Sequence, residues 1–431
     1  MNKIIHILKK RGYQEFLIFL LLFVAGIGFG NLLTKKNTVI PAAEKDISKA
    51  FVSEIYDKIK ENYWNNISDV ELLDLFKLSI DRNGGQTDLP KFDNKEKLLD
   101  SVSSITKKMD EEKRNKFITQ VAQTVLASLN PPQRSGLFTE KQEEQLKNTV
   151  SNINPDKDLY KDLEVNKEAS KAAIEQAYQK KSQQLSQDQS PKAKEKLKEI
   201  AYAKDVLTGQ DSKVRYDTNK VEPTIFYKTI EPAILYVQFK KFSPTSYEEF
   251  IKAFETYQND SNLSSLIFDL RGNIGGAIDA TAYFLGNFIG QNQYAFDFYH
   301  KGEYLPFKTP TNKLASISKY KQVVILIDNQ TQSSAEMMAV SLKKFHVGVV
   351  LGTNTKGWGT VEKVFPLDNQ IDPKQKYSMF LVHSITLRDD NQPIEGRGVE
   401  PDINITKADW QQLLFLYFRN DRLTEAVKSL L

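Results

Sequence analysis

The sequence predicts an α/β core in its C-terminal half, preceded by an all-α region, a helical hairpin and one apolar N-terminal segment. Apolar residues recur at helical spacing in the first third of the chain, as at Phe51, Ile55, Ile59 and Tyr63. A stretch rich in Lys, Gln, Ala and Ser follows. Beyond Pro223, short apolar strands alternate with helical segments, which is typical of an α/β sheet. A length of 431 residues allows about two to three domains.

Composition and charge exclude several classes of function. The 59 Lys and Arg residues against 55 Asp and Glu residues leave a formal charge of +4, an excess too small to indicate nucleic-acid binding. The chain has no cysteine, which excludes disulfides, thiolate zinc sites and a cysteine nucleophile. It has only four histidines, so a histidine-rich metal site is not expected. The sequence implies no metal and no cofactor.

Residues 16–33 form an uncharged apolar run, FLIFLLLFVAGIGFGNLL. The run is just long enough to span a bilayer as a helix. Basic residues are more numerous before it than after it: Lys3, Lys9, Lys10 and Arg11 against Lys35 and Lys36. This pattern predicts that residues 1–36 are a cytoplasmic N-terminus and a single transmembrane anchor in the cell membrane, with the body of the protein on the extracytoplasmic side. A cleaved signal peptide is the alternative, although no Ala-x-Ala site follows the run.

Residues 37–152 are predicted to be a helical region. A second apolar face, at residues 72–80, repeats the pattern of the first, and Gly84, Gly85 and Pro90 interrupt it. A further helical stretch is expected over residues 105–129. Thr139 and Gln142 then match a capping box that opens another helix. No residue here suggests chemistry, so we interpret the region as a packing or partner-binding module.

The predicted α/β core comprises residues 221–431. Strands are expected at 233–239, 265–270, 323–327 and 347–351, and helices at 247–257, 278–289 and 334–345. The tail, residues 410–430, is expected to form one or two amphipathic helices that pack on this core.

Residues 153–220 are predicted to form a separate unit with helices at 167–185 and 191–207. The segments DLYKDLEVNKEASKAAIEQAYQKKSQQL and AKEKLKEIAYAKDVLTGQDSKVRYD carry its apolar pattern. They resemble the J-domain of co-chaperones, and we call residues 153–220 the J-like unit. The family's His-Pro-Asp triplet, which triggers the chaperone ATPase, falls on Ser186, Gln187 and Asp188. The resemblance therefore implies the fold, as a scaffold or peptide-contact module, and argues against a chaperone ATPase partner.

The first candidate site is the turn DLRGNIGG, residues 269–276, which follows an expected strand. Its glycines permit positive φ and let backbone amides approach a ligand closely. Amides aimed at a developing oxyanion stabilise the transition states of acyl transfer. An ordinary tight strand-to-helix turn is the alternative. The spacing G-x-G-x-x-G is missing, so the turn is not a dinucleotide-binding fingerprint.

The second candidate site is NQTQSSAE, residues 329–336, at the start of an expected helix. The free amides and the positive end of a helix dipole would stabilise an anionic intermediate formed at Ser333. Ser333 and Glu336 also fit the Ser-x-x-Glu capping box. On this segment alone a structural cap therefore remains the alternative.

Together the two segments resemble the C-terminal processing, or tail-specific, serine peptidases, which use a serine–lysine dyad. The family's D-L-R-x-N-x-G-G turn corresponds to residues 269–276, and its serine segment to residues 332–336. Residues 352–361 resemble the first ten positions of its G-x-x-T-x-G-K-G-x-V-Q segment, whose glutamine position falls on Glu362. Residues 398–402 resemble its G-I-x-P-D segment. The resemblance covers residues 223–405 and implies a ClpP/crotonase-like α/β peptidase fold with a polypeptide substrate or client. The family's PDZ domain is not recognisable, and the J-like unit occupies its place.

The resemblance also implies roles for single residues. Ser333 would be the nucleophile, and the amides of Ser334 and of Gly275 or Gly276 would form the oxyanion hole. The family lysine, however, falls on Trp358. A buried neutral lysine takes the serine proton, whereas an indole has no basic nitrogen and can only donate a hydrogen bond.

Lys356 is the candidate replacement base, because it lies two residues before Trp358 and would share its side of an extended chain. His346 and His383 are conceivable bases, although each is more typical of a structural role. Two functions therefore stay open. The chain is either a serine endopeptidase homologue that cleaves exported or envelope polypeptides, or a catalytically impaired pseudopeptidase that binds polypeptides or partner proteins.

Overall fold

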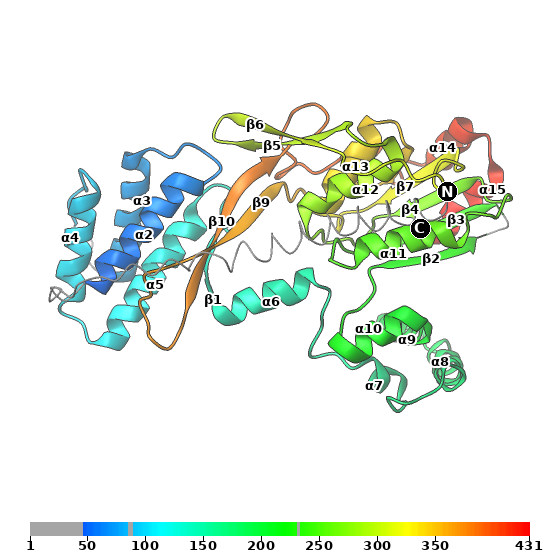
Figure 1. The fold of residues 1–431 in the computed structure, drawn as a ribbon, viewed down its shortest axis with the longest axis horizontal. Coiled ribbons are helices and arrows are strands. Elements are labelled where there is room, and N and C mark those ends of the chain that lie inside the picture. Colours follow the sequence, from blue (N-terminus) through cyan, green and yellow to red (C-terminus); the bar gives the residue numbers. More distant parts are fainter. Residues whose placement is uncertain (1–45, 85–88, 231–232) are drawn as a thin grey trace, which may run out of the picture.

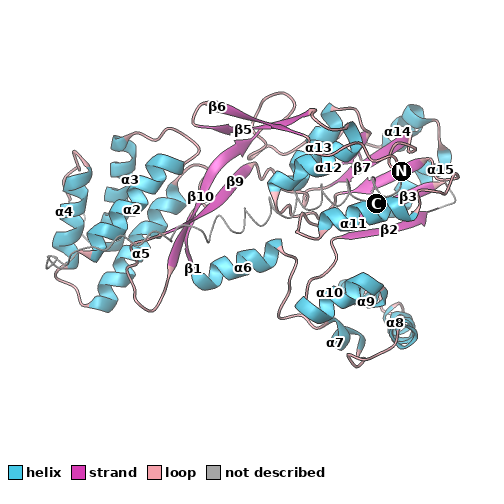
Figure 2. Ribbon diagram, viewed as in Figure 1, coloured by secondary structure: helices cyan, strands magenta, loops and turns pink. Residues whose placement is uncertain are grey.

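The computed structural model describes residues 46–84, 89–230 and 233–431. The molecule is elongated, with a helical bundle at one end and an α/β layer at the other (Figure 1). Long strands connect these two parts, and a small helical unit lies beside the α/β layer (Figure 2).

The N-terminal bundle consists of four helices, which are α2 (Ile47–Asn62), α3 (Asp69–Gly84), α4 (Lys95–Thr106) and α5 (Glu111–Ser128). Side chains of Asp46, Asn94 and Asp110 accept hydrogen bonds from backbone amides at the first turns of α2, α4 and α5, which satisfies donors that a helix start leaves free. The expected helix over 105–129 is wrong at its start, because Asp110 caps a new helix there.

The core of the bundle is completed by residues from the other end of the chain. Leu367, Ile371, Met379 and Leu381 pack in one cluster with the apolar faces of the bundle helices. Met379 and Leu381 lie on the long strand β10 (Tyr377–Thr386). Because apolar burial is the main favourable term in folding, this shared cluster ties the helical region to the C-terminal half.

Helix α6 (Glu140–Val150) leads from the bundle to the J-like unit, and the expected capping box between Thr139 and Gln142 forms at its start. The unit contains α7 (Leu159–Leu163), α8 (Lys171–Leu185), α9 (Pro191–Thr208) and α10 (Gln210–Asn219). It has its own apolar cluster. Arg215 joins the unit to the α/β layer through ion pairs of 3.0 Å to Glu248 and 2.9 Å to Glu249.

A six-stranded sheet forms the α/β core, in the order β11-β8-β7-β4-β3-β2. Its strands are β2 (Ile225–Ile230), β3 (Ile234–Phe239), β4 (Ser265–Asp269), β7 (Gln322–Ile327), β8 (Val349–Gly352) and β11 (Ile403–Asn404). All neighbours run parallel except β2 and β3. The predicted α/β core and its expected strands are confirmed.

Helices cover both faces of this sheet. One side carries α11 (Ser246–Thr256), the short η1 (Ile278–Ala280), α12 (Thr281–Ile289) and α13 (Ser334–Lys344). The other carries α14 (Trp410–Phe418) and α15 (Asp421–Leu430). Along β4, Leu266 and Phe268 join the first cluster and Ile267 joins the second, as alternation along a strand requires. The expected tail helix is therefore two helices.

A second sheet was not anticipated from the sequence. It comprises β1 (Gly136–Thr139), β5 (Tyr294–His300), β6 (Glu303–Lys308), β9 (Thr360–Pro366) and β10. Strand β10 pairs with β1, β5 and β9. This sheet joins the helical bundle to the α/β core (Figure 2).

The predicted anchor, residues 16–33, lies outside the described residues. Within the ranges that the structure describes, no helix is long and apolar enough to cross a membrane. This finding contradicts the prediction of a single-pass protein in the cell membrane with an extracytoplasmic body. We therefore withdraw that location.

Candidate active site

Four polar side chains hold the glycine turn after β4 in place. Asp269 is fully buried and accepts hydrogen bonds from Tyr236 Oη at 2.8 Å and from Arg271 Nη2 at 2.7 Å. Asn273, also fully buried, donates to the Phe239 carbonyl at 2.7 Å. These bonds satisfy polar groups that would otherwise be costly to bury, and they fix the path of the turn.

Gly275 and Gly276 let the turn press against the start of α13. Their φ values of 84° and 139° are accessible to glycine at little cost. A Cβ atom at Gly275 would lie 2.7 Å from Ser333 Cβ, which leaves no room for a side chain. Ser334 Oγ also donates to the Gly276 carbonyl at 3.0 Å. The two predicted segments therefore meet in space.

The backbone amides expected to form the oxyanion hole differ in whether they already donate a hydrogen bond. The Gly275 amide already donates to Asn273 Oδ1 at 2.9 Å. For the amides of Gly276 and Ser334, no acceptor is found in the part of the chain that the structure describes. Of the two glycine amides, the one at Gly276 is thus the one free to face a ligand.

Ser333 has an unusual backbone conformation, with φ 56° and ψ −124°. Such a conformation costs about 1–3 kcal/mol for a residue with a side chain, and strain of this kind concentrates at functional sites. Ser333 is half-buried. Its amide donates to Glu336 Oε2 at 2.8 Å, so the expected Ser-x-x-Glu pairing is present, and it coexists with the strained serine.

Glu336 links Ser333 by hydrogen bonds to the loop at residues 355–358. Its fully buried carboxylate accepts hydrogen bonds from Thr355 Oγ1 at 2.5 Å, from the Gly357 amide at 2.7 Å and from the Trp358 amide at 2.8 Å. Oε2 accepts from both the Ser333 and the Trp358 amides, so these two backbones flank one oxygen atom. Burial raises the pKa of Glu336, although the four hydrogen bonds oppose this shift. The backbone of Trp358, where the resemblance places the family lysine, is therefore brought beside the backbone of Ser333.

The Trp358 side chain is engaged on two sides. Its Nε1 donates to Glu362 Oε1 at 3.1 Å, and the Arg134 guanidinium lies over its ring, 3.6 Å from the ring centroid. Burial raises the pKa of Glu362 to about 7, while hydrogen bonds from Thr360 and Trp358 partly oppose this shift. The indole at position 358, where the resemblance places the family lysine, is thus held between an arginine and a carboxyl group.

Lys356 is not held near a partner. Its side chain is exposed, and among the described residues it makes no hydrogen bond or ion pair, while its amide donates to the Thr331 carbonyl at 2.9 Å. The chain is not extended there, because Gly357 has φ 80°. Lys356 and Trp358 therefore do not lie on one side of an extended chain. The role of Lys356 as the base stays a prediction.

The two histidines considered as bases make no hydrogen bond to Ser333 within the described ranges. His346 follows α13 with φ 51°. His383 stacks on His300 at 4.3 Å between ring centroids, and its Nε2 lies 3.3 Å from Lys363 Nζ. Burial and the neighbouring Lys363 lower the pKa of His383 to about 4.

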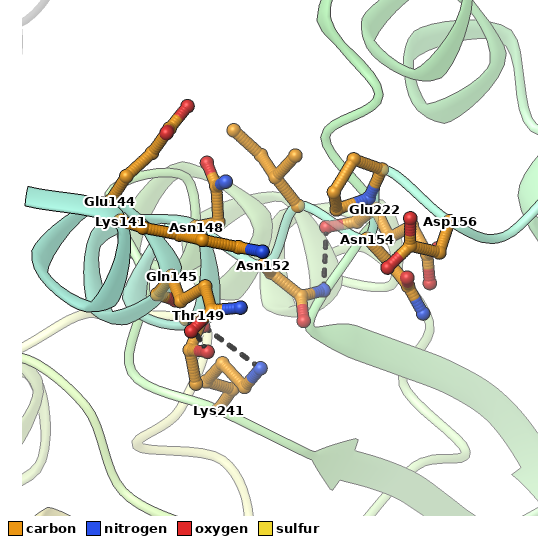
Figure 3. Close-up of a pocket in the computed structure, with 12 residues that line it drawn as sticks. Lys141, Glu144, Gln145, Asn148, Thr149, Asn152, Asn154, Asp156, Glu222 and Lys241 are labelled. Carbon is orange, nitrogen blue, oxygen red and sulfur yellow. Dashed lines mark hydrogen bonds between the residues drawn. The ribbon is translucent and has the colours of Figure 1, made fainter.

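A polar cavity of about 670 Å³ lies away from this site, at the neck of the J-like unit (Figure 3). Residues of α6, the segment 152–156, Glu222 and Lys241 line it. Lys241 Nζ donates to the Thr149 carbonyl at 3.0 Å, and Asn152 Nδ2 donates to the Glu222 carbonyl at 2.9 Å (Figure 3). These bonds hold together the chain segments that enter and leave the unit.

Comparison with known families agrees with this arrangement. Residues 233–405 match the model of peptidase family S41, and residues 158–217 match the model of the DnaJ domain. The resemblance to the C-terminal processing peptidases is confirmed. The J-like unit is likewise supported as a DnaJ-type domain.

Curated relatives match only part of the chain. The carboxy-terminal processing protease CtpA of Bacillus subtilis is 25% identical over 210 residues, which are 48% of this chain and 42% of that protein. CtpB of the same organism is 25% identical over 177 residues, 41% of this chain and 34% of that protein. A probable CtpA-like serine protease of Staphylococcus epidermidis is 24% identical over 204 residues, 47% and 40% of the two chains. This chain thus matches between about a third and two fifths of the length of these relatives.

Among solved structures, the photosystem II D1 C-terminal processing protease has a TM-score of 0.48 at 13% identity, covering 84% of this chain and 93% of that one. A lipoprotein from Streptococcus agalactiae has a TM-score of 0.44 at 13% identity, covering 89% and 99%.

Two residues of this site, Arg134 and Glu395, could not be found from the sequence. Arg134 lies in a loop whose sequence has no motif. Glu395 accepts hydrogen bonds from Arg134 and from the Gly359 amide, yet it lies in a turn without a recognisable motif. Glu362 could be located from the sequence, because the resemblance places the family glutamine at its position.

Proposed function

We propose that this chain is a polypeptide-binding homologue of the C-terminal processing serine peptidases, which hydrolyses peptide bonds slowly or not at all. Membership of residues 233–405 in a peptidase family model supports a polypeptide as the ligand. The observation that carries the proposal is Trp358 at the position where the resemblance expects the base, with a backbone amide that shares Glu336 Oε2 with the amide of Ser333.

The chemistry of the base decides between the two functions. A serine hydroxyl attacks a carbonyl only when another group takes its proton, and a positioned base typically contributes about 10²–10⁴-fold to the rate. The Trp358 nitrogen is a donor only, and it already donates to Glu362. Lys356 is exposed, and no hydrogen bond joins its side chain to Ser333 among the described residues.

The rest of the arrangement supports retained binding. The Gly276 and Ser334 amides face no acceptor among the described residues, and the strained Ser333 stands beside them. Such donors can bind a substrate carbonyl even where no base completes the reaction. We therefore infer a cleft that holds a polypeptide carbonyl near Ser333 with little turnover.

A second candidate function is slow hydrolysis with Glu362 or Lys356 as the base. One observation favours Glu362: burial raises its pKa to about 7, the range in which a general base works best. Its Oε1 is occupied by the Trp358 and Thr360 donors, so only the other oxygen is left to accept a proton.

The test uses fluorescein-labelled casein, with cleavage followed by fluorescence release and binding by anisotropy. Wild type, Ser333→Ala, Lys356→Ala and Trp358→Lys are compared. We expect binding by all four, negligible cleavage by wild type and measurable cleavage by Trp358→Lys. Robust wild-type cleavage that is lost in Ser333→Ala would refute the pseudopeptidase proposal. Concurrent loss in Lys356→Ala would then identify the base.

We further propose that the J-like unit does not stimulate a chaperone ATPase, because Ser186 and Gln187 replace the histidine and proline of the trigger. Steady-state ATPase assays of a bacterial Hsp70 with the full chain test this. A Ser186→His, Gln187→Pro double variant serves as the matched comparison, and stimulation by wild type would overturn the proposal.

A further inference from the structure

Arg134 reaches the candidate site from the helical region. It lies between α5 and β1, and its guanidinium stacks on the Trp358 ring at 3.6 Å from the ring centroid. A planar guanidinium over an indole face is a favourable cation–π contact. The bundle therefore supplies a side chain to a site that is otherwise built from the C-terminal half.

A carboxylate fixes the arginine in this place. Glu395 Oε1 accepts from Arg134 Nε at 3.0 Å and from Nη2 at 2.8 Å, and its Oε2 accepts from the Gly359 amide at 2.8 Å. The two side chains are only 19% and 15% exposed, so this ion pair is screened less than one on the open surface. Glu395 thus binds Arg134 and the residue after Trp358 at the same time.

The backbone around Arg134 is anchored on both sides. The Gln133 amide donates to the Ala127 carbonyl at 2.8 Å, at the end of α5. The Ser135 hydroxyl accepts from the Val382 amide of β10 at 3.1 Å. Arg134 therefore has little freedom to leave Trp358 unless the bundle moves relative to β10.

We propose that Trp358 is a polypeptide-contacting side chain and that Arg134 is the positioning residue that holds its ring ready for binding. This inference rests on the proposed function, because it assigns a binding role to the side chain that replaces the base. Arg134 covers one face of the indole and Glu362 accepts a hydrogen bond from its edge. Trp358 is partly exposed, and we infer that its exposed part meets an apolar side chain of the ligand. Aromatic rings with few rotatable bonds give such contacts at a low cost in entropy.

Removing Arg134 should weaken binding through lost preorganisation. Ordering one side chain on binding typically lowers affinity about 2–10-fold, so we expect Arg134→Ala to bind labelled casein about 3–10-fold more weakly than wild type. Arg388→Ala is the matched control, because Arg388 is 18% exposed and pairs with Asp390 and Glu400 instead. It should bind casein as wild type does.

A spectroscopic readout separates positioning from general damage. In 5-fluorotryptophan-labelled full-length chain, each of the three Trp residues gives a ¹⁹F resonance. Arg134→Ala and Arg134→Gln should both move the Trp358 resonance and leave the Trp64 and Trp410 resonances in place. Weaker binding together with this selective shift supports the inference.

Failure of the proposed function and failure of the role of Arg134 give different results. If wild type binds no casein, the proposed function itself falls. If wild type binds casein and Arg134→Ala binds equally well, or if Arg388→Ala weakens binding as much, the function stands and the role of Arg134 is refuted.

Discussion

The carboxyl group of Glu362 should govern the pH dependence of stability around the candidate site. Burial raises its pKa from 4.5 to about 7, because the charged form loses solvation. The folded protein therefore holds this proton more tightly than the unfolded chain does. The resulting stabilisation is fully present below about pH 4.5 and is lost as the pH rises through about 7.

The magnitude follows from the size of the shift. One pKa unit corresponds to about 1.4 kcal/mol, so the shift at Glu362 is worth at most about 3 kcal/mol. The side chain keeps some contact with solvent, which places the effect below this ceiling. Glutamine at this position retains an oxygen that can accept from Trp358 Nε1 and removes the buried charge. We expect Glu362→Gln to raise the free energy of unfolding by about 1–3 kcal/mol at pH 8 and to change it little at pH 5.

The assay is urea unfolding at pH 5, 6, 7 and 8, followed by the ¹⁹F resonance of Trp358 so that the unit containing Glu362 is measured. Glu303→Gln is the control, because Glu303 is exposed on β6, and it should leave the pH profile unchanged. In wild type the Trp358 resonance should also titrate with a midpoint near 7. Parallel stability profiles for wild type and Glu362→Gln would refute the reasoning.

Three further predictions concern the contacts that build and position the site. Gly276→Ala should lower the free energy of unfolding by about 2 kcal/mol more than Gly272→Ala does. A methyl group at Gly276 would overlap a backbone carbonyl, whereas nothing lies within 4 Å of a methyl group at Gly272. Equal losses of stability in urea unfolding would contradict this. Glu336→Gln should lower the free energy of unfolding by about 2–4 kcal/mol. The buried carboxylate accepts from four donors, and the substitution removes one acceptor oxygen. An unchanged melting temperature would count against this prediction. Arg215→Ala should speed limited proteolysis where the J-like unit joins the chain. Lys147→Ala, which removes an ion pair within α6, should not; identical digestion of both variants would argue against docking through Arg215.

Features that depend on residues close together in the chain could be predicted from the sequence. The short apolar run at 265–270 and the glycines that follow predicted β4 and its turn, and the Ser-x-x-Glu spacing predicted the pairing of Ser333 with Glu336. Strand β6 could not be predicted in the same way, because Pro306 interrupts it and nearly all of its residues are exposed. It has no buried face to impose a period of two.

Long-range contacts account for the rest. Arg134 and Glu395 are 261 positions apart, and no local pattern indicates that they pair. The suggestion that Lys356 could replace the base assumed an extended chain, which the positive φ of Gly357 excludes. The role of Glu336 in holding the loop of Trp358 also depends on tertiary structure, since the spacing alone predicts only a helix cap.

Acylation of Ser333 tests the central claim most directly. The chain is incubated with p-nitrophenyl acetate, and the acetyl group is located by mass spectrometry of proteolytic peptides in wild type, Trp358→Lys and the Ser333→Ala, Trp358→Lys double variant. Without a base beside the serine, we predict no acetyl group on Ser333 of wild type, acetylation of Ser333 in Trp358→Lys, and none at that position in the double variant. Rapid acetylation of Ser333 in wild type would show an activated nucleophile and would contradict the account.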